Sequence, residues 1–338
     1  MRKRTFIKTL GLGLVSLSTA NRGWGSRSNR LPLILPSTIK PGDTVGIITP
    51  SSPLVDERGY AIAEENFRTL GLRIKWGRHV GERDGHLAGT DEARLADLHG
   101  MFNDEEVKAI ICLRGGSGAA RLLDKLDYGL ISRHPKIFLG YSDITAYHQA
   151  IYTQTGLVTF HGAVANSKWT PMVFSQFENL FFKGMSPTYA AEPGKFRILN
   201  GGIAEGRLLG GNLTVLTGIA GSKYYPDFED GILFIEDVGE EPYRVDRMFS
   251  QLALSGALSK IKGFIFGQCT DCEAKNPENS LTLERILDDY IRPLGIPAFR
   301  GASIGHIDEQ YIMPVGAKAQ IDSAKGSITV LETIFSTK

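Results

Sequence analysis

The sequence is poor in cysteine, with three such residues among 338. Cys112 lies in the apolar run 107–113, which predicts a buried and unreactive thiol. Cys269 and Cys272 form a single C-x-x-C pair with no second Cys or His pair nearby. A zinc site would need two more ligands, so we expect no bound metal. The pair leaves two alternatives open: a local disulfide in an oxidising compartment, or two free thiols.

An excess of charge of one sign is also lacking. The 38 Lys and Arg residues nearly balance the 37 Asp and Glu residues, for a formal net charge of +1. This balance argues against a nucleic-acid partner and against a strongly charged partner surface. With 42% hydrophobic residues and no internal repeat or low-complexity tract, the chain is predicted to be folded and long enough for two domains.

The apolar run near the N-terminus, residues 10–17, is too short to span a bilayer, so we expect no stable membrane span in the mature chain. Basic residues at 2–8 precede it and small residues at 18–20 follow it. This pattern predicts a signal peptide over residues 1–20 and an exported, periplasmic protein. Lys3 replaces one arginine of a twin-arginine signal, which leaves Sec and twin-arginine export both open. The alternative is an N-terminal tail on a cytoplasmic protein.

The first half of the mature chain, residues 31–185, alternates between strand-like and helix-like segments. This order predicts an α/β fold with a doubly wound, mostly parallel sheet. In such sheets, ligands gather beyond the carboxyl ends of the strands. The expected strands cover residues 44–49, 72–76, 107–113 and 137–139, and the expected helices cover residues 60–70, 90–98, 119–123 and 144–152.

A glycine-rich loop, Arg114-Gly-Gly-Ser-Gly118, follows the third expected strand. Its spacing is neither that of a dinucleotide-binding loop nor that of a P-loop, so no nucleotide cofactor is predicted. Glycines also let bare backbone N–H groups approach a reacting carbonyl, which is the catalytic use of such a loop. A structural turn is the alternative.

Gly140 ends the fourth expected strand, and Ser142 and Asp143 then begin a helix. This order predicts a serine on a tight strand-to-helix turn, with the helix N-terminus directed at an oxyanion. It is not the G-x-S-x-G elbow of α/β-hydrolases, because Ile144 stands where the second glycine would be. The alternative is that Ser142 or Asp143 caps the helix.

The second half is predicted to follow an aromatic linker, residues 169–193, that carries a helix packed between the domains. The strand-like run 232–235 ends at Glu236, and a carboxylate in that position is either paired or used in chemistry. His306 lies in a loop between strands, where a histidine is more often structural than catalytic unless a partner is found. A final pair of strands closes the chain.

Motifs throughout the chain resemble the LD-carboxypeptidase family, which comprises muramoyl-tetrapeptide carboxypeptidases and microcin C immunity peptidases. The resemblance covers residues 31–335, and the motifs occur in the family's order. They are Pro41-Gly-Asp-Thr-Val-Gly-Ile-Ile-Thr-Pro50, Leu87-Ala-Gly-Thr-Asp91, Arg114-Gly-Gly-Ser-Gly118, Gly140-Tyr-Ser-Asp-Ile-Thr145, Phe160-His-Gly162, Gly210-Gly-Asn212, Glu236-Asp-Val-Gly-Glu240, Pro242-Tyr-Arg-Val-Asp-Arg247 and Gly305-His306.

The resemblance implies a serine peptidase in which Ser142 is the nucleophile, Glu236 the orienting acid and His306 the general base. Backbone N–H groups would form the oxyanion hole; they belong to Asp143 and to Gly115 or Gly116. The family plan also implies an N-terminal α/β domain, residues 31–185, and a β-rich C-terminal domain, residues 200–338, with the active site in the cleft between them.

The substrates implied by the resemblance are peptidoglycan-derived peptides, from which the enzyme would release the terminal D-alanine of murein tetrapeptides. A free carboxylate needs a cation, for which Arg114 and Arg244 are candidates unless they pair with neighbouring acids. Ser117 and residues 307–310 depart from the family pattern near the substrate pocket. The alternatives are a microcin-type immunity peptidase and a non-catalytic periplasmic binding protein. A homodimer is compatible with the sequence, which does not fix the oligomeric state.

Overall fold

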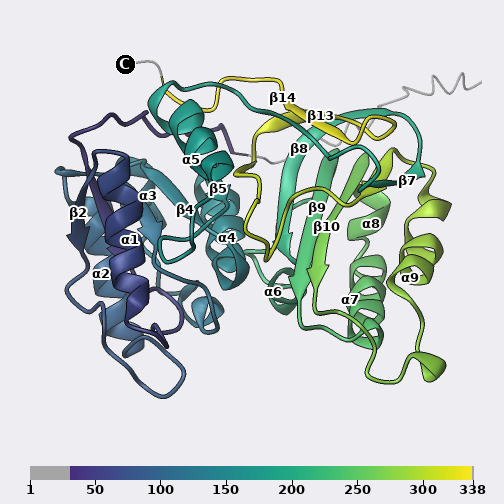
Figure 1. The fold of residues 1–338 in the computed structure, drawn as a ribbon, viewed down its shortest axis with the longest axis horizontal. Helices are drawn as coiled ribbons and strands as arrows, with labels where there is room; N and C mark the ends of the chain where they lie inside the picture. Colours follow the sequence, from purple (N-terminus) through teal and green to yellow (C-terminus); the bar gives the residue numbers. More distant parts are fainter. Residues whose placement is uncertain (1–30, 337–338) are drawn as a thin grey trace, which may run out of the picture.

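The computed structural model describes residues 31–336, and the predicted signal peptide lies outside these residues. The described chain forms two lobes, each built on one β-sheet (Figure 1). The first sheet has the strand order β12-β5-β4-β3-β1-β2, and only the pairing of β12 with β5 is antiparallel. Its strands are β1 (Thr44–Ile48), β2 (Arg73–Trp76), β3 (Val107–Cys112), β4 (Ile137–Gly140), β5 (Thr159–His161) and β12 (Met313–Val315).

Helices cover both faces of this sheet because its central strands bury side chains on both sides. Val45 and Ile47 of β1 share a core with Phe67, whereas Ile48 shares a second core with Phe102 on the opposite face. The predicted doubly wound fold is therefore confirmed. One face carries α1 (Arg58–Thr69) and α5 (Pro171–Phe177); the other carries α2 (Asp91–Asn103), α3 (Tyr128–Arg133) and α4 (Thr145–Thr155).

The second sheet has the order β6-β14-β13-β8-β9-β10-β11-β7. Its four central strands, β8 to β11, run parallel, and antiparallel strands flank them on both sides. The C-terminal half is therefore rich in strands, as predicted. The strands are β6 (Thr188–Ala190), β7 (Arg197–Asn200), β8 (Ile203–Asn212), β9 (Gly231–Val238), β10 (Gly263–Thr270), β11 (Ala298–Arg300), β13 (Lys318–Asp322) and β14 (Ser327–Val330).

Helices also connect these central strands, so the second lobe repeats the α/β pattern of the first. Leu233 and Ile235 of β9 pack with Phe249 and Leu287 of the covering helices. Figure 1 shows α7, α8 and α9 along one side of this sheet. The helices are α6 (Leu213–Gly218), α7 (Pro242–Leu254), α8 (Ala257–Lys260) and α9 (Leu283–Tyr290).

The two lobes share one continuous core. Phe234 of β9 and Ile265 of β10 belong to the same buried cluster as Phe177 of α5, the helix predicted in the linker. Strand β12 comes from the C-terminal half yet completes the first sheet. The core packing and the pairing of β12 with β5 thus both cross the predicted boundary between residues 31–185 and 200–338. Within residues 31–336, no helix is long and apolar enough to cross a membrane.

Candidate active site

Ser142 occupies a strained turn between β4 and α4. Its φ angle is +65°, and it is one of three non-glycine residues among residues 31–336 with a positive φ. Such a conformation costs on the order of 1–3 kcal/mol and clusters at functional sites. A short 3₁₀ turn, Ser142–Ile144, then leads into α4, whose N-cap has no side-chain hydrogen bond. The cap alternative for Ser142 and Asp143 therefore does not describe this helix.

The glycine-rich loop lies directly against Ser142 because β3 and β4 are neighbours in the sheet. A Cβ atom on Gly115 would lie 2.9 Å from Ser142 Cβ and 3.3 Å from Ser142 Oγ. Glycine at position 115 thus allows the backbone to approach the hydroxyl. Within residues 31–336, the backbone N–H groups of Gly115, Gly116 and Asp143 donate to no acceptor. These three groups remain available to bind an oxyanion.

The side chain of Asp143 fixes this loop rather than taking part in the triad. Its Oδ2 accepts hydrogen bonds from the Ala119 N–H, at 2.8 Å, and from the Ser51 hydroxyl. Ser52 adds a second link, since its Oγ accepts from the Ser117 N–H at 2.9 Å. The loop that follows β1 and the glycine-rich loop are therefore tied together around the turn that carries Ser142.

Glu236 and His306 form a hydrogen-bonded pair supplied by the second lobe. Glu236 lies near the carboxyl end of β9, and its Oε2 is 2.8 Å from His306 Nδ1. Gly305 allows this approach, because a Cβ at that position would lie 3.0 Å from Glu236 Oε2. Thr270 holds the loop by donating to the His306 carbonyl at 3.1 Å. With Nδ1 directed at the carboxylate, Nε2 of His306 is left for the substrate side.

His306 and Ser142 line the same pocket, of about 390 Å³, at the junction of the lobes. The ring of Tyr141 lies 4.8 Å from the ring of His306, which links the serine turn to the histidine loop. No hydrogen bond joins Ser142 Oγ to the His306 ring in the described structure. Arg114, Gly115 and Gly116 line the pocket as well. The structure therefore places the predicted serine, histidine and glycine loop around one cavity, with Glu236 behind the histidine.

A second histidine, His161, approaches the same carboxylate, and no role was predicted for it from the sequence. Its side chain is fully buried at the end of β5, and Nε2 lies 3.8 Å from Glu236 Oε1. Neither of its ring nitrogens has a hydrogen-bond partner among the described residues. Burial opposes ionisation of Glu236, but the adjacent imidazoles of His161 and His306 outweigh it and lower its pKa to about 2. The sequence feature that could have indicated a role for His161 was the motif Phe160-His-Gly162.

The motif Gly210-Gly-Asn212 brings the second sheet against the first lobe. Gly211 has a φ of +134°, and a Cβ there would lie 2.5 Å from Thr145 Oγ1 and 3.1 Å from His161 Cδ2. The Asn212 N–H donates to Thr145 Oγ1 at 2.9 Å. This contact between β8 and α4 sets the position of the neighbouring strand β9, and therefore of Glu236 relative to His161.

The two candidate cations occupy different places. Arg114 lines the pocket that holds Ser142 and donates to the Pro53 carbonyl at 2.8 Å. Arg244 lies on α7, outside that pocket lining, with a half-exposed side chain. Its guanidinium is 3.5 Å from Glu240 Oε2, and its Nε donates to the Tyr243 hydroxyl at 3.0 Å. Pairing with a neighbouring acid, the alternative noted for these arginines, is what the structure shows for Arg244.

The cysteines have structural roles. Cys269 and Cys272 form a disulfide with a Cα–Cα distance of 5.5 Å, the first of the two alternatives that the sequence left open. Cys112 is free and buried as predicted, and burial raises the pKa of its thiol. In the described part of the chain, no group of three or more His, Cys, Asp or Glu side chains is arranged to hold a metal ion.

A serine, an imidazole and a buried carboxylate thus lie together at the junction of two α/β lobes. The family model for the LD-carboxypeptidase N-terminal domain matches residues 45–162, and the one for the C-terminal domain matches residues 205–321. The chain belongs to the LD-carboxypeptidase family, as its motifs predict.

Individual relatives resemble the chain over most of its length. The "Probable murein peptide carboxypeptidase" of Bacillus subtilis (strain 168) is 42% identical over 300 residues, which cover 87% of this chain and 93% of that protein. The crystal structure of muramoyltetrapeptide carboxypeptidase from Oxalobacter formigenes is 29% identical, with a TM-score of 0.76 and coverage of 87% and 100%. The structure of MccF in complex with glutamyl sulfamoyl guanosine is 27% identical, with a TM-score of 0.82 and coverage of 90% and 100%.

Proposed function

We propose that this protein is a serine-type LD-carboxypeptidase that releases the terminal D-alanine of murein tetrapeptides. The observation that carries the proposal is the 2.8 Å hydrogen bond between Glu236 and His306, whose ring shares a pocket with Ser142. A non-catalytic binding protein has no need of a buried carboxylate paired with an imidazole beside a strained serine.

Each step of the reaction has a residue positioned for it. Nε2 of His306 accepts the proton of the Ser142 hydroxyl as Oγ attacks the carbonyl carbon of the scissile amide. The N–H groups of Asp143 and of Gly115 or Gly116 bind the oxyanion that forms. His306 then donates its proton to the departing amine of D-alanine. A water molecule, deprotonated by His306, cleaves the acyl ester and regenerates Ser142.

Glu236 supports both proton transfers without exchanging a proton itself. Its carboxylate accepts from Nδ1 and so keeps Nε2 free to act as the base. The lowered pKa of Glu236, at about 2, means that it is ionised whenever His306 becomes an imidazolium. The imidazolium therefore forms next to a fixed negative charge.

The murein substrate is supported by the names of the relatives in Bacillus subtilis and Oxalobacter formigenes. The signal-like residues 1–20 favour export to the periplasm, where murein peptides are encountered. The resemblance to MccF favours a second candidate, cleavage of an amide between an acidic residue and a nucleotide-like group. The predicted export disfavours this second candidate, because an immunity peptidase would act in the cytoplasm.

A matched set of three peptides tests the substrate. They are L-Ala-D-Glu-diaminopimelate-D-Ala, the pentapeptide that ends in D-Ala-D-Ala, and the all-L tetrapeptide. Mass spectrometry should show loss of one alanine from the first peptide alone. Faster cleavage of the all-L peptide would overturn LD-specificity, and cleavage of an aminoacyl sulfamoyl nucleoside alone would favour the second candidate. Light scattering on the same preparation decides between a monomer and a homodimer.

A further inference from the structure

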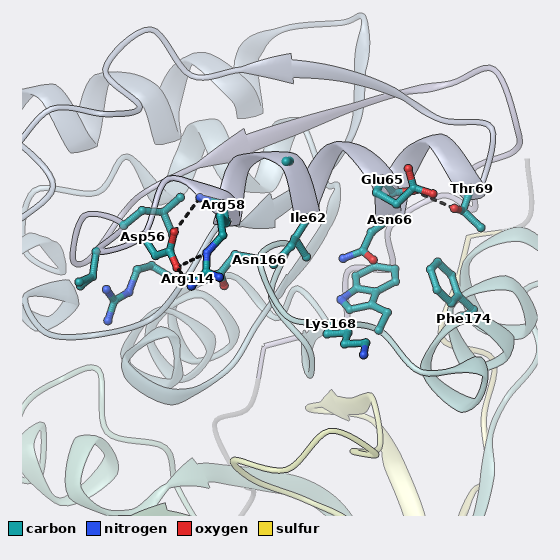
Figure 2. Close-up of a pocket in the computed structure, with 15 residues that line it drawn as sticks. Asp56, Arg58, Ile62, Glu65, Asn66, Thr69, Arg114, Asn166, Lys168 and Phe174 are labelled. Atoms are coloured by element: carbon teal, nitrogen blue, oxygen red, sulfur yellow. Dashed lines mark hydrogen bonds and ion pairs between the residues drawn. The ribbon is translucent and has the colours of Figure 1, made fainter.

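A second and larger pocket adjoins the one that holds Ser142. It measures about 930 Å³ and lies between α1 and residues 166–174, and we call it the α1 pocket. Arg114 and Asn166 line both pockets, so the two are adjacent. Figure 2 shows Ile62 and Asn66 of α1 along one side of it, with Lys168 and Phe174 on the other.

Buried contacts hold residues 164–169, which form the wall of the pocket opposite α1. The Asn66 amide, which is buried, donates to the carbonyl oxygens of Ala165 and Ser167 at 3.0 and 2.8 Å. The Trp169 indole donates to the Val164 carbonyl at 3.0 Å, and its ring packs 5.3 Å from that of Phe67. These contacts fix the position of residues 164–169 relative to α1. A preformed, mainly apolar pocket with a few polar groups is the usual form of a ligand site.

The charges of the α1 pocket are unbalanced in favour of cations. Its two acids, Asp56 and Glu65, pair with Arg58 and Arg68 respectively. Lys168 makes no ion pair or hydrogen bond with any described residue, and the Arg114 guanidinium donates only to a carbonyl. Two cations without acidic partners favour a ligand that carries a carboxylate.

The chemistry of a carboxypeptidase indicates which part of the substrate the α1 pocket receives. Only one residue lies on the leaving side of the scissile bond, and D-alanine fills a small fraction of 930 Å³. All other residues of the peptide lie on the acyl side. A large pocket next to the nucleophile therefore serves the acyl side.

We propose that the α1 pocket binds the acidic N-terminal part of the murein peptide, with Lys168 as the cation for its carboxylate. This inference rests on the proposed function, because it takes the released residue to be D-alanine. The D-glutamyl residue supplies one free carboxylate on the acyl side. The diaminopimelate side chain carries another, which the tetrapeptide shares with the shorter diaminopimelate-D-alanine. The apolar wall, including Ile62 and Phe174, packs against the alanyl and aliphatic parts of the peptide.

A pair of substrates tests the assignment. The tetrapeptide fills the α1 pocket, whereas the dipeptide diaminopimelate-D-alanine lacks the acidic N-terminal part. In Lys168→Glu, the ratio of kcat/KM for the tetrapeptide to that for the dipeptide should fall about tenfold or more, mainly through KM. The effect should shrink in high salt, because the interaction is between charges near the surface. Ala61→Trp, on the exposed face of α1 that lines the pocket, should lower the same ratio by blocking space.

The matched control is Lys108→Glu, an exposed lysine on β3 outside the lining of both pockets. It makes the same change in net charge and should leave the ratio unaltered. An unchanged ratio in both Lys168→Glu and Ala61→Trp, or an equal fall in Lys108→Glu, would overturn the proposal.

Calorimetry with the tripeptide L-Ala-D-Glu-diaminopimelate separates this proposal from the proposed function. The wild type should bind the tripeptide at least tenfold more tightly than Lys168→Glu does, whether or not turnover is observed. Equal affinities would refute the subsite even in an active enzyme. An inactive wild type that still shows the difference in affinity would refute the catalytic proposal alone.

Discussion

At the scale of single residues, the proposed chemistry depends on one carboxylate held between two imidazoles. His306 meets one oxygen of Glu236 at 2.8 Å, and His161 approaches the other at 3.8 Å. Because His161 is completely buried, the contact cannot be replaced by solvent. We infer that His161 is a positioning residue, which keeps Glu236 ionised and oriented toward His306.

Two substitutions of His161 separate positioning from packing. His161→Leu removes the ring nitrogens, and kcat/KM should fall about 10- to 100-fold, by analogy with the loss of a residue that orients a metal ligand. His161→Gln retains an N–H donor and should recover part of that loss. Steady-state kinetics over a pH series provides the readout, with a changed acid limb expected only in His161→Leu. Equal activities and equal profiles for the two variants would indicate a space-filling role.

The titration of Asp237 makes the free energy of unfolding depend on pH. Burial and the adjacent charge of Glu236 raise its pKa to about 6, although four hydrogen bonds from Asn212, Thr214 and Val238 favour the charged form. An acid that binds its proton more tightly in the folded state stabilises that state below its unfolded pKa. This stabilisation is lost as the pH rises from about 4 to about 6.

Urea unfolding at several pH values tests this term. Between pH 4 and 6, the unfolding free energy of the wild type should fall relative to that of Asp237→Asn, which does not titrate. The change in the difference should be about 3 kcal/mol, from a shift of roughly two pKa units. If the difference in unfolding free energy between the wild type and Asp237→Asn did not change between pH 4 and 6, the raised pKa of Asp237 would be contradicted.

At the scale of elements, glycines set how closely strands and loops approach the site. Gly305 has a φ of +129° and lies against the Glu236 carboxylate, whereas Gly239 has a φ of +69° with no atom within 4 Å of a Cβ. At Gly239, in the left-handed helical region, a side chain costs about 1 kcal/mol. The φ of Gly305 lies outside that region and is nearly restricted to glycine, so the backbone penalty there is larger. Only Gly305 also determines the distance between His306 and Glu236.

Alanine at these two positions should therefore have different effects on activity. Gly305→Ala is expected to lower kcat at least tenfold, because the added methyl group displaces the loop that carries His306. Gly239→Ala should lower the melting temperature less than Gly305→Ala does, and should retain kcat within about twofold. Thermal denaturation and steady-state kinetics on both variants give the comparison. If both variants lost kcat to a similar extent, backbone strain rather than the approach of His306 to Glu236 would explain the loss.

The sequence predicted the local elements better than the contacts between them. The alternation of short apolar runs with amphipathic segments was a local signal that the structure confirms. An example is the helix expected over residues 90–98, which is α2 with Thr90 as its N-cap. The antiparallel pairing of β12 with β5 joins residues 152 to 156 positions apart, for which the sequence holds no local pattern. His161 was missed for the same reason, because its partner Glu236 lies in the other lobe.

At the scale of the whole molecule, the site exists only because the two lobes meet. Ser142 and the glycine-rich loop belong to the first sheet, whereas Glu236 and His306 belong to the second lobe. The shared core and the contact of β8 with α4 hold these groups around one pocket. The proposed peptidase therefore has its nucleophile on one lobe and its base and acid on the other.

The most direct test is the turnover of the murein tetrapeptide by Ser142→Ala, with His306→Ala as its companion. Nucleophile and base act as a unit, so each substitution should reduce kcat on the order of 10⁴-fold or more, with little change in the melting temperature. Intact-mass measurement should also show an acyl adduct that depends on Ser142. Turnover by folded Ser142→Ala at the wild-type rate would contradict the assignment of the nucleophile.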